Sequence, residues 1–210
     1  LCLSRIVRKI GAMTINDFWN IIDQARPESR NIGEFNQNLN RLLESLPDED
    51  LLYFDYFFKM YECTIIASPN RLIWSALSLV YGGKHKYNTY GFAAWLILQG
   101  KSHYLAVLHD ADRLADTEAT QNYCSGNLKG HEHEFPEQRY LAGRIYSKRN
   151  RIGIRAFEKT TKEFAPKANT EWQKIEQQEL NSPTFQSNRN WTLEDLAVIL
   201  PNTYQKYICV

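Results

Sequence analysis

The sequence predicts an all-α fold, a single compact multi-helix domain with long polar loops in its C-terminal half. Apolar residues recur at intervals of three and four along several segments, which is the spacing of one helix face. We find no strand pattern with turn residues between apolar runs. With 210 residues, of which 43% are hydrophobic, the chain is long enough to bury one core and is not typical of a disordered protein.

The first predicted helix lies in "MTINDFWNIIDQAR". Thr14, followed three residues later by Asp17, resembles a capping box, and Pro27 ends the segment. The apolar positions that share one face are Phe18, Ile21, Ile22 and Ala25, with Trp19 beside them. A second stripe follows at Phe35, Leu39, Leu42, Leu43 and Leu46.

The next two helices begin at prolines. Pro47 is expected at the first helical position, with acidic residues in the first turn, where the helix dipole favours them. Ser68 is the expected cap of the following helix, and Pro69 comes next. Gly82 or Gly83 can then adopt the left-handed conformation that ends a helix. The buried stripe of this helix is Leu72, Ile73, Ala76, Leu77 and Val80.

Further helices complete the series. One passes through Phe92, Trp95 and Leu96 to a stop at Gly100, and Ser102 is expected to cap the short segment after it. We expect Trp19, Trp74 and Trp95 to be mostly buried, since each lies on or beside an apolar stripe.

The last third of the chain alternates between helices and loops. Helices are expected around residues 138–146 and 154–164, and Thr192 with Asp195 forms a second capping pair before a final helix. Residues 117–134 and most of 165–190 are expected to be loops.

Cysteine use and the N-terminus indicate a cytoplasmic protein. Cys2, Cys63, Cys124 and Cys209 are far apart with no CxxC pair, which fits a reducing compartment. Cys63 stands among apolar neighbours and is expected to be a buried, inert thiol. Basic residues interrupt any secretory core before residue 13, and no uncharged apolar stretch is long enough to span a membrane. We expect residues 1–12 to be an extension and 13–210 to be the domain, with Met13 as a candidate start.

The net charge of +1 gives no whole-chain electrostatic reason to expect nucleic-acid binding. The charge is nevertheless uneven. From Met13 to Glu118 there are 9 basic and 14 acidic residues, and from Ala119 to Trp172 there are 10 and 6. Two interpretations stay open: solvated faces on a dipolar surface, or an acidic face that meets a basic partner.

Four motifs in order, "TINDFWNIIDQAR", "LIWSALSLVYGG", "GFAAWLILQGKSHY" and "HDADRLAD", resemble the bacterial family called domain of unknown function 4240. The resemblance covers about Met13 to Tyr207 and implies a fold rather than a settled activity. Family members carry Cys-Ser-Asp-Asp after the glycines and an Arg in the next helix. Here the corresponding positions are Lys84, His85, Lys86, Tyr87 and Ala93. The positions that carry the resemblance are Trp19, Trp74, Gly82, Gly83, Trp95, Gly100, Asp110 and Asp112.

No group of residues forms a complete catalytic or metal-binding pattern. Asp110 and Asp112 could bind a hard cation, or their carboxylates could bond backbone amides in an Asx turn or at a helix start. His131 and His133 lack the further ligands of a zinc site. The cluster Lys148, Arg149, Arg151 and Arg155 could meet phosphate or be a solvated helix end. We therefore expect no enzyme activity, no metal and no cofactor.

The sequence favours a protein-binding module, most concretely an immunity-type protein that neutralises a bacterial toxin by covering its active site. We expect a cognate protein partner, possibly a toxin effector, and neither membrane nor nucleic acid. One alternative is a ligand-binding or enzymatic pocket near Gly82–Tyr90 with Asp110 and Asp112, and another is a structural accessory domain. Tyr87 and Tyr90 could instead fold back and cover the domain's own core. The expected partner-binding residues are Lys84, His85, Lys86, Tyr87, Tyr90, Asp110 and Asp112.

Overall fold

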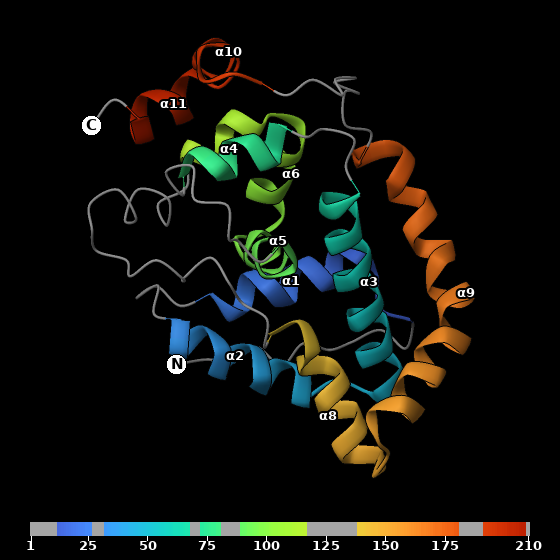
Figure 1. Ribbon diagram of the computed structural model, residues 1–210. Coiled ribbons are helices and arrows are strands. Elements are labelled where there is room, and N and C mark those ends of the chain that lie inside the picture. Colours follow the sequence, from blue (N-terminus) through green and yellow to red (C-terminus); the bar gives the residue numbers. More distant parts are fainter. Residues whose placement is uncertain are drawn as a thin grey trace. The chain divides into compact units, whose positions relative to one another are not determined.

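The computed structural model describes residues 12–26, 32–67, 72–80, 89–116, 138–180 and 191–208. Within these ranges all regular structure is helical and no strand occurs, so the predicted all-α, multi-helix fold is confirmed (Figure 1). The residues group into two compact units, Leu1–Phe57 with Leu141–Glu171, and Phe58–Tyr140 with Trp172–Val210. We call them unit 1 and unit 2. That the helices form one domain from residue 13 onward stays a prediction.

Unit 1 begins with a helix pair. α1 (Ile15–Ala25) starts at the predicted capping box, in which the Thr14 hydroxyl accepts the Asp17 N–H at 3.2 Å and the Asp17 carboxylate accepts the Thr14 N–H at 2.9 Å. α2 (Ile32–Glu44) packs against α1 (Figure 1). The Asn38 side chain donates to the Ala25 carbonyl at 3.3 Å, so α2 satisfies a backbone group at the end of α1.

Aromatic rings fill the centre of unit 1. The ring of Phe18 on α1 lies 5.0 Å from that of Trp19 and 4.9 Å from that of Phe54 on α3 (Asp48–Ile66). Trp19 is buried, as predicted. The edge-to-face arrangement of Phe18 and Trp19 adds roughly 0.5–1.5 kcal/mol beyond the burial of their area.

Arg149 ties α8 (Leu141–Asn150) to the junction between α2 and α3. Its guanidinium donates to the carbonyls of Leu46 at 2.8 Å and Glu44 at 3.0 Å, and to the Asp48 carboxylate at 2.6 Å. Asn150 donates to the other Asp48 oxygen at 2.8 Å. Partial burial raises the pKa of Asp48, but the hydrogen bonds from Asn150 and Arg149 and the charge of Arg149 together hold it below its usual value.

α3 begins at Asp48, one residue later than predicted, because Pro47 supplies the carbonyl that accepts the Leu51 N–H at 3.1 Å.

α9 (Ile154–Glu179) corrects the prediction that most of residues 165–190 are a loop, since the helix continues to residue 179 through Pro166. An internal proline lacks an N–H and crowds the preceding turn, which costs about 3 kcal/mol. The cost is offset by apolar side chains on one face before and after the proline, with Phe157, Ala168 and Trp172 all buried. In unit 1, Phe164 on this helix packs edge-on against Tyr53 at 4.7 Å.

Unit 2 has α5 (Thr89–Leu98) as its most buried helix, with every residue from Gly91 to Leu98 buried. The Phe92 ring lies 5.8 Å from Trp74 on α4 (Leu72–Val80) and 5.7 Å from Trp95. Trp95 is buried, and Trp74 is mostly buried, both as predicted. Trp74 keeps some exposure because it lies beside the apolar stripe of its helix rather than on it.

The turn into α6 (Lys101–His109) depends on Gly100, whose φ of 91° lies in the left-handed region that favours glycine. The Gly100 carbonyl accepts the Tyr104 N–H at 2.9 Å, so the helix begins at Lys101 and not at a Ser102 cap. The prediction of a Ser102 cap is wrong, because Ser102 already lies inside the first turn.

A second aromatic cluster lies inside unit 2. Tyr61 on α3 packs edge-on against Tyr104 at 5.2 Å and against Trp172 on α9 at 4.8 Å. The Tyr104 hydroxyl donates to the Tyr61 carbonyl at 2.8 Å. Burial, and to a lesser degree Tyr61, raises the pKa of Tyr104 well above its ordinary value.

Short helices complete unit 2. η1 (Ala111–Asp116) and α11 (Pro201–Ile208) pack on each other and on α4, and α10 (Leu193–Ile199) precedes α11 (Figure 1). The predicted capping box of Thr192 and Asp195 is present at α10. η2 (Gln138–Tyr140) leads into α8. None of the described helices is long and apolar enough to cross a membrane.

Candidate functional site

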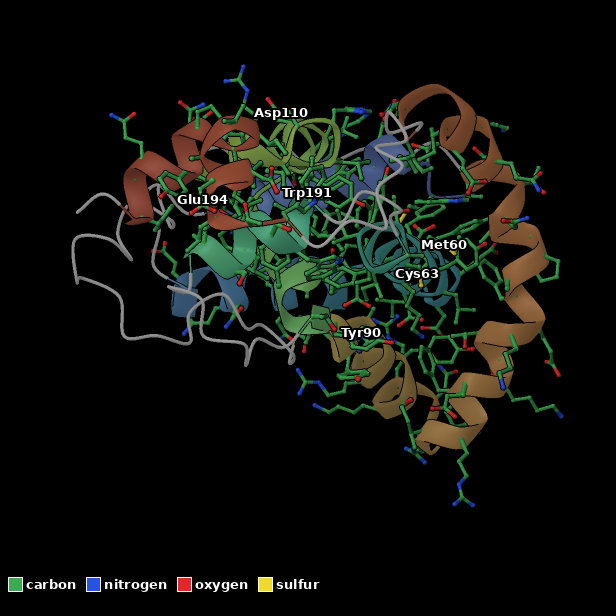
Figure 2. The ribbon with its side chains drawn as sticks, turned by 45° about the horizontal axis from the view of Figure 1, so that its top comes forward. Met60, Cys63, Tyr90, Asp110, Trp191 and Glu194 are labelled. Atoms are coloured by element: carbon green, nitrogen blue, oxygen red, sulfur yellow. The ribbon has the colours of Figure 1, made fainter. Side chains whose placement is uncertain are left out.

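The predicted partner-binding residues fall into two groups. Lys84, His85, Lys86 and Tyr87 lie outside the described residues, as do Gly82, Gly83, His131 and His133. Tyr90, Asp110 and Asp112 are described. Figure 2 shows Tyr90 and Asp110 well apart within unit 2, so these two residues do not form one site.

Asp112 is buried, and its carboxylate accepts hydrogen bonds from the first residues of α11. Its Oδ1 accepts the N–H and the hydroxyl of Thr203, each at 2.8 Å. Its Oδ2 accepts the backbone N–H of Asn202 at 3.1 Å and the side-chain amide of Asn202 at 2.8 Å. The carboxylate therefore caps the first turn of α11, whose backbone N–H groups have no intrahelical acceptor. With Asp112 6% exposed, these oxygens are not available to a partner in this conformation.

Asp110 is exposed, and its carboxylate contacts residues two and three positions further along the chain. Its Oδ1 accepts the Asp112 N–H at 3.1 Å, which is the Asx-turn alternative of the sequence analysis. Its other oxygen lies 3.6 Å from Arg113. Both aspartates thus bond backbone amides, as one of the two interpretations predicts. Among the described residues no group of three or more His, Cys, Asp and Glu is placed to hold a metal ion.

Tyr90 belongs to a different arrangement at the surface of unit 2. The guanidinium carbon of Arg139 lies 4.3 Å from the centre of the Tyr90 ring and 5.3 Å from that of the Tyr140 ring. Tyr90 and Tyr140 are 46% and 48% exposed, which is unusual for such large apolar rings. We call Tyr90, Arg139 and Tyr140 the tyrosine–arginine cluster. Figure 2 shows Tyr90 within unit 2, in the first turn of α5.

Buried Glu62 on α3 holds the arginine of this cluster in place through an ion pair. The Nε of Arg139 lies 2.9 Å from a carboxylate oxygen of Glu62, whose side chain is 1% exposed while that of Arg139 is 22% exposed. The Nε–H bond is not aligned with that oxygen, so the contact is an ion pair rather than a directed hydrogen bond. The pair holds the guanidinium beside both tyrosine rings, with the Arg139 side chain still partly exposed.

Comparison with protein families matches residues 13–148 to the family described as Protein of unknown function (DUF4240). The chain belongs to this family. Comparisons with curated proteins and with solved structures give no match. Glu62, Tyr90, Asp112, Arg139 and Tyr140 all lie in the matched DUF4240 region, whereas Thr203 and the rest of α11 lie beyond it.

Sequence analysis of this DUF4240 chain missed Arg139, Tyr140 and Glu62. One signal was present: Glu62 falls in the largely apolar second half of α3, between Tyr61 and Cys63, where a buried carboxylate requires a partner. The identity of that partner could not be predicted, because Arg139 is 77 positions away in sequence and no local spacing connects the two.

Cys63, the neighbour of Glu62, was also placed wrongly. The structure has Cys63 exposed, because two positions along a helix turn about 200° and Cys63 therefore faces away from buried Tyr61 and Ile65. Apolar neighbours in sequence do not determine burial on a helix, since successive residues point about 100° apart.

Proposed function

We propose that this chain is a protein-binding module that recognises its partner through the tyrosine–arginine cluster. The observation that carries the proposal is the Arg139 guanidinium held against two half-exposed tyrosine rings. Tyrosine and arginine are the residue types enriched at the energetically important centres of protein interfaces.

The cluster is suited to binding because it is already ordered. The ion pair with buried Glu62 and the contact with Tyr90 restrict the Arg139 side chain before any partner arrives. A long side chain that is fixed in advance loses less conformational entropy on association, which is roughly 0.5–1.5 kcal/mol for each such residue. The two rings supply large contact areas with few rotatable bonds.

A more specific proposal concerns the kind of partner. We propose an immunity-type role, in which the cluster covers the active site of a bacterial toxin effector. Lys84, His85, Lys86 and Tyr87, just before Tyr90 in sequence, extend the proposed contact. The alternative of an enzymatic or ligand pocket with Asp110 and Asp112 has less support, because the Asp112 oxygens are bound to α11. Nothing specific favours the structural accessory alternative.

In the first step of the test, a photo-reactive phenylalanine analogue replaces Tyr140, and the chain is produced in a bacterial host that contains candidate effectors. We expect a specific cross-linked protein that is absent when the analogue replaces Val198, an 81% exposed residue of α10. The purified pair is then titrated by calorimetry. Tyr140→Ala should weaken binding at least tenfold without lowering the melting temperature.

Two results distinguish the general proposal of a protein-binding module from the specific proposal of an immunity role. Inhibition of the partner's catalytic activity at one equivalent supports the immunity role, and binding without inhibition refutes that role alone. Affinity that is unchanged by Tyr90→Ala and by Tyr140→Ala refutes the cluster as the binding surface.

A further inference from the structure

A basic surface lies where α8 meets α9 in unit 1. Between Leu141 and Phe157 the sequence holds five Arg or Lys residues and no Asp or Glu. All five are exposed, and Figure 1 shows α8 joined to α9 by a short connection. Arg144 and Lys148 are spaced i, i+4, so they share one face of α8, and Arg151 directly follows the last residue of that helix. With Arg155 in the first turn of α9, we call these four residues the basic corner.

Three residues of the basic corner differ from their neighbour Arg149 in their partners. Arg149 is committed to Asp48 and to two backbone carbonyls. The side chains of Lys148, Arg151 and Arg155 form no ion pair or hydrogen bond within the described part of the chain. Like charges at i, i+4 repel one another on a helix, so the pairing of Arg144 with Lys148 on α8 opposes local stability.

Arg151 adds a second local cost. Its φ of 54° places it in the left-handed region, where it is the single non-glycine residue among those described. The Ile152 N–H donates to the Ser147 carbonyl at 3.0 Å, which is the bond of a Schellman helix end. Glycine is the favoured residue at this position, because a side chain is strained there. An arginine at a position that favours glycine carries this local cost, which is consistent with a role for its exposed side chain.

We propose that the basic corner is a docking surface for a carboxylate-rich segment of a protein partner. The structure contains an example of this recognition, since Arg149 on the same helix binds Asp48 in the acidic first turn of α3. A protein segment fits better than nucleic acid for two reasons. The chain as a whole carries a net charge of only +1, and beyond the corner Glu158 and Glu163 alternate with Lys159 and Lys162, so the basic surface does not continue along α9 as an extended phosphate backbone would require. A short acidic segment meets the corner and ends before those glutamates.

The experiment measures binding of the intact chain to a short fluorescent peptide of alternating Asp and Glu, at low ionic strength. A single-stranded oligonucleotide of equal charge and vesicles of anionic lipid serve as competing probes. We expect Arg151→Gly to weaken peptide binding about threefold or more, because one exposed charge pair is lost. Its melting temperature should not fall and should rise by up to about 3 °C, because the left-handed strain is relieved. Lys148→Glu combined with Arg155→Glu should weaken binding more than about tenfold.

Lys162→Gln is the matched control, since Lys162 is an exposed cation of α9 outside the corner whose side chain pairs with no group in the described part of the chain. It should leave peptide affinity unchanged. The proposal is overturned if Arg151→Gly and the double variant bind the peptide as well as the parent chain, or if Lys162→Gln costs as much as Arg151→Gly. Tighter binding of the oligonucleotide or of the vesicles than of the peptide also overturns it.

Discussion

Asp112 and Thr203 are joined by two hydrogen bonds of 2.8 Å, from the backbone N–H and from the hydroxyl of Thr203 to the same carboxylate oxygen. Both residues are buried, and they are 91 positions apart in sequence. A side chain from η1 thus acts as the cap of α11, a role that a residue just before a helix usually performs. A second contact joins the same two helices, because the Lys206 ammonium on α11 donates to the Ala115 carbonyl of η1 at 2.5 Å.

Asp112→Ala should destabilise the chain by about 2–4 kcal/mol, because buried N–H groups of α11 lose their acceptor. Urea denaturation measures the loss, and hydrogen exchange should localise it to residues 201–208. The matched control is Asp110→Ala, which removes an exposed carboxylate and should cost well under about 1 kcal/mol. Equal losses for the two variants would contradict the capping role.

Asp48 and Arg149 should make stability depend on pH in the acid range. The folded pKa of Asp48 lies below its ordinary value of 3.8. Its contribution is therefore fully present above that value and is lost as the pH falls through the lower folded pKa. Asp48→Asn should cost about 1 kcal/mol near neutral pH, a modest amount because the pair is partly exposed, and progressively less in acid as the pH falls through the folded pKa.

The control for this pair is a double-mutant cycle with Arg149→Met, measured by urea denaturation at both pH values. The coupling between the two positions should be favourable near neutral pH and absent in acid. A coupling that persists unchanged in acid would mean that the pair does not act through the Asp48 charge.

Gly143 on α8 is required by its contact with Phe157. A Cβ at position 143 would lie 2.6 Å from Cε1 of the Phe157 ring, which is closer than side chains approach. Gly143→Ala should therefore destabilise by about 1–3 kcal/mol, although alanine is the better helix former. Thermal denaturation checks this, and Phe157→Leu in the same chain should recover much of the loss. An alanine variant as stable as the parent would show that the two helices can separate freely.

Cys63 should react in the folded protein. Its side chain is exposed on α3, so a maleimide reagent should label it under native conditions at a rate close to that in urea. Peptide mapping separates it from Cys2, Cys124 and Cys209, which lie outside the described residues. Protection of Cys63 until the chain unfolds would restore the sequence-based prediction of a buried thiol.

Local rules predicted much of the fold. The two capping boxes at Thr14 and Thr192 were correct, because a cap depends on residues three positions apart. The end of α9 was missed: residues 165–190 were expected to be mostly loop, but the burial of Ala168 and Trp172 keeps the chain helical past Pro166 to residue 179. Tertiary packing of this kind is not visible in local propensity.

The candidate site was less predictable from sequence. Tyr90 was chosen for its residue type, but Arg139 reaches it only through the fold. Asp112 was selected as a motif residue, and the fold turns its carboxylate inward to Thr203. Contacts between residues far apart in sequence decide both outcomes, and no spacing rule anticipates them.

The most direct test of the account is calorimetry of the cross-linked partner, once purified, against the chain and against Arg139→Lys. Lysine keeps the positive charge beside Glu62 but lacks the planar guanidinium that lies against both rings. The account predicts at least a tenfold loss of affinity with an unchanged melting temperature, and no loss for Leu193→Ala, a 52% exposed residue of α10. Full affinity in Arg139→Lys together with Tyr90→Ala would contradict recognition through the tyrosine–arginine cluster.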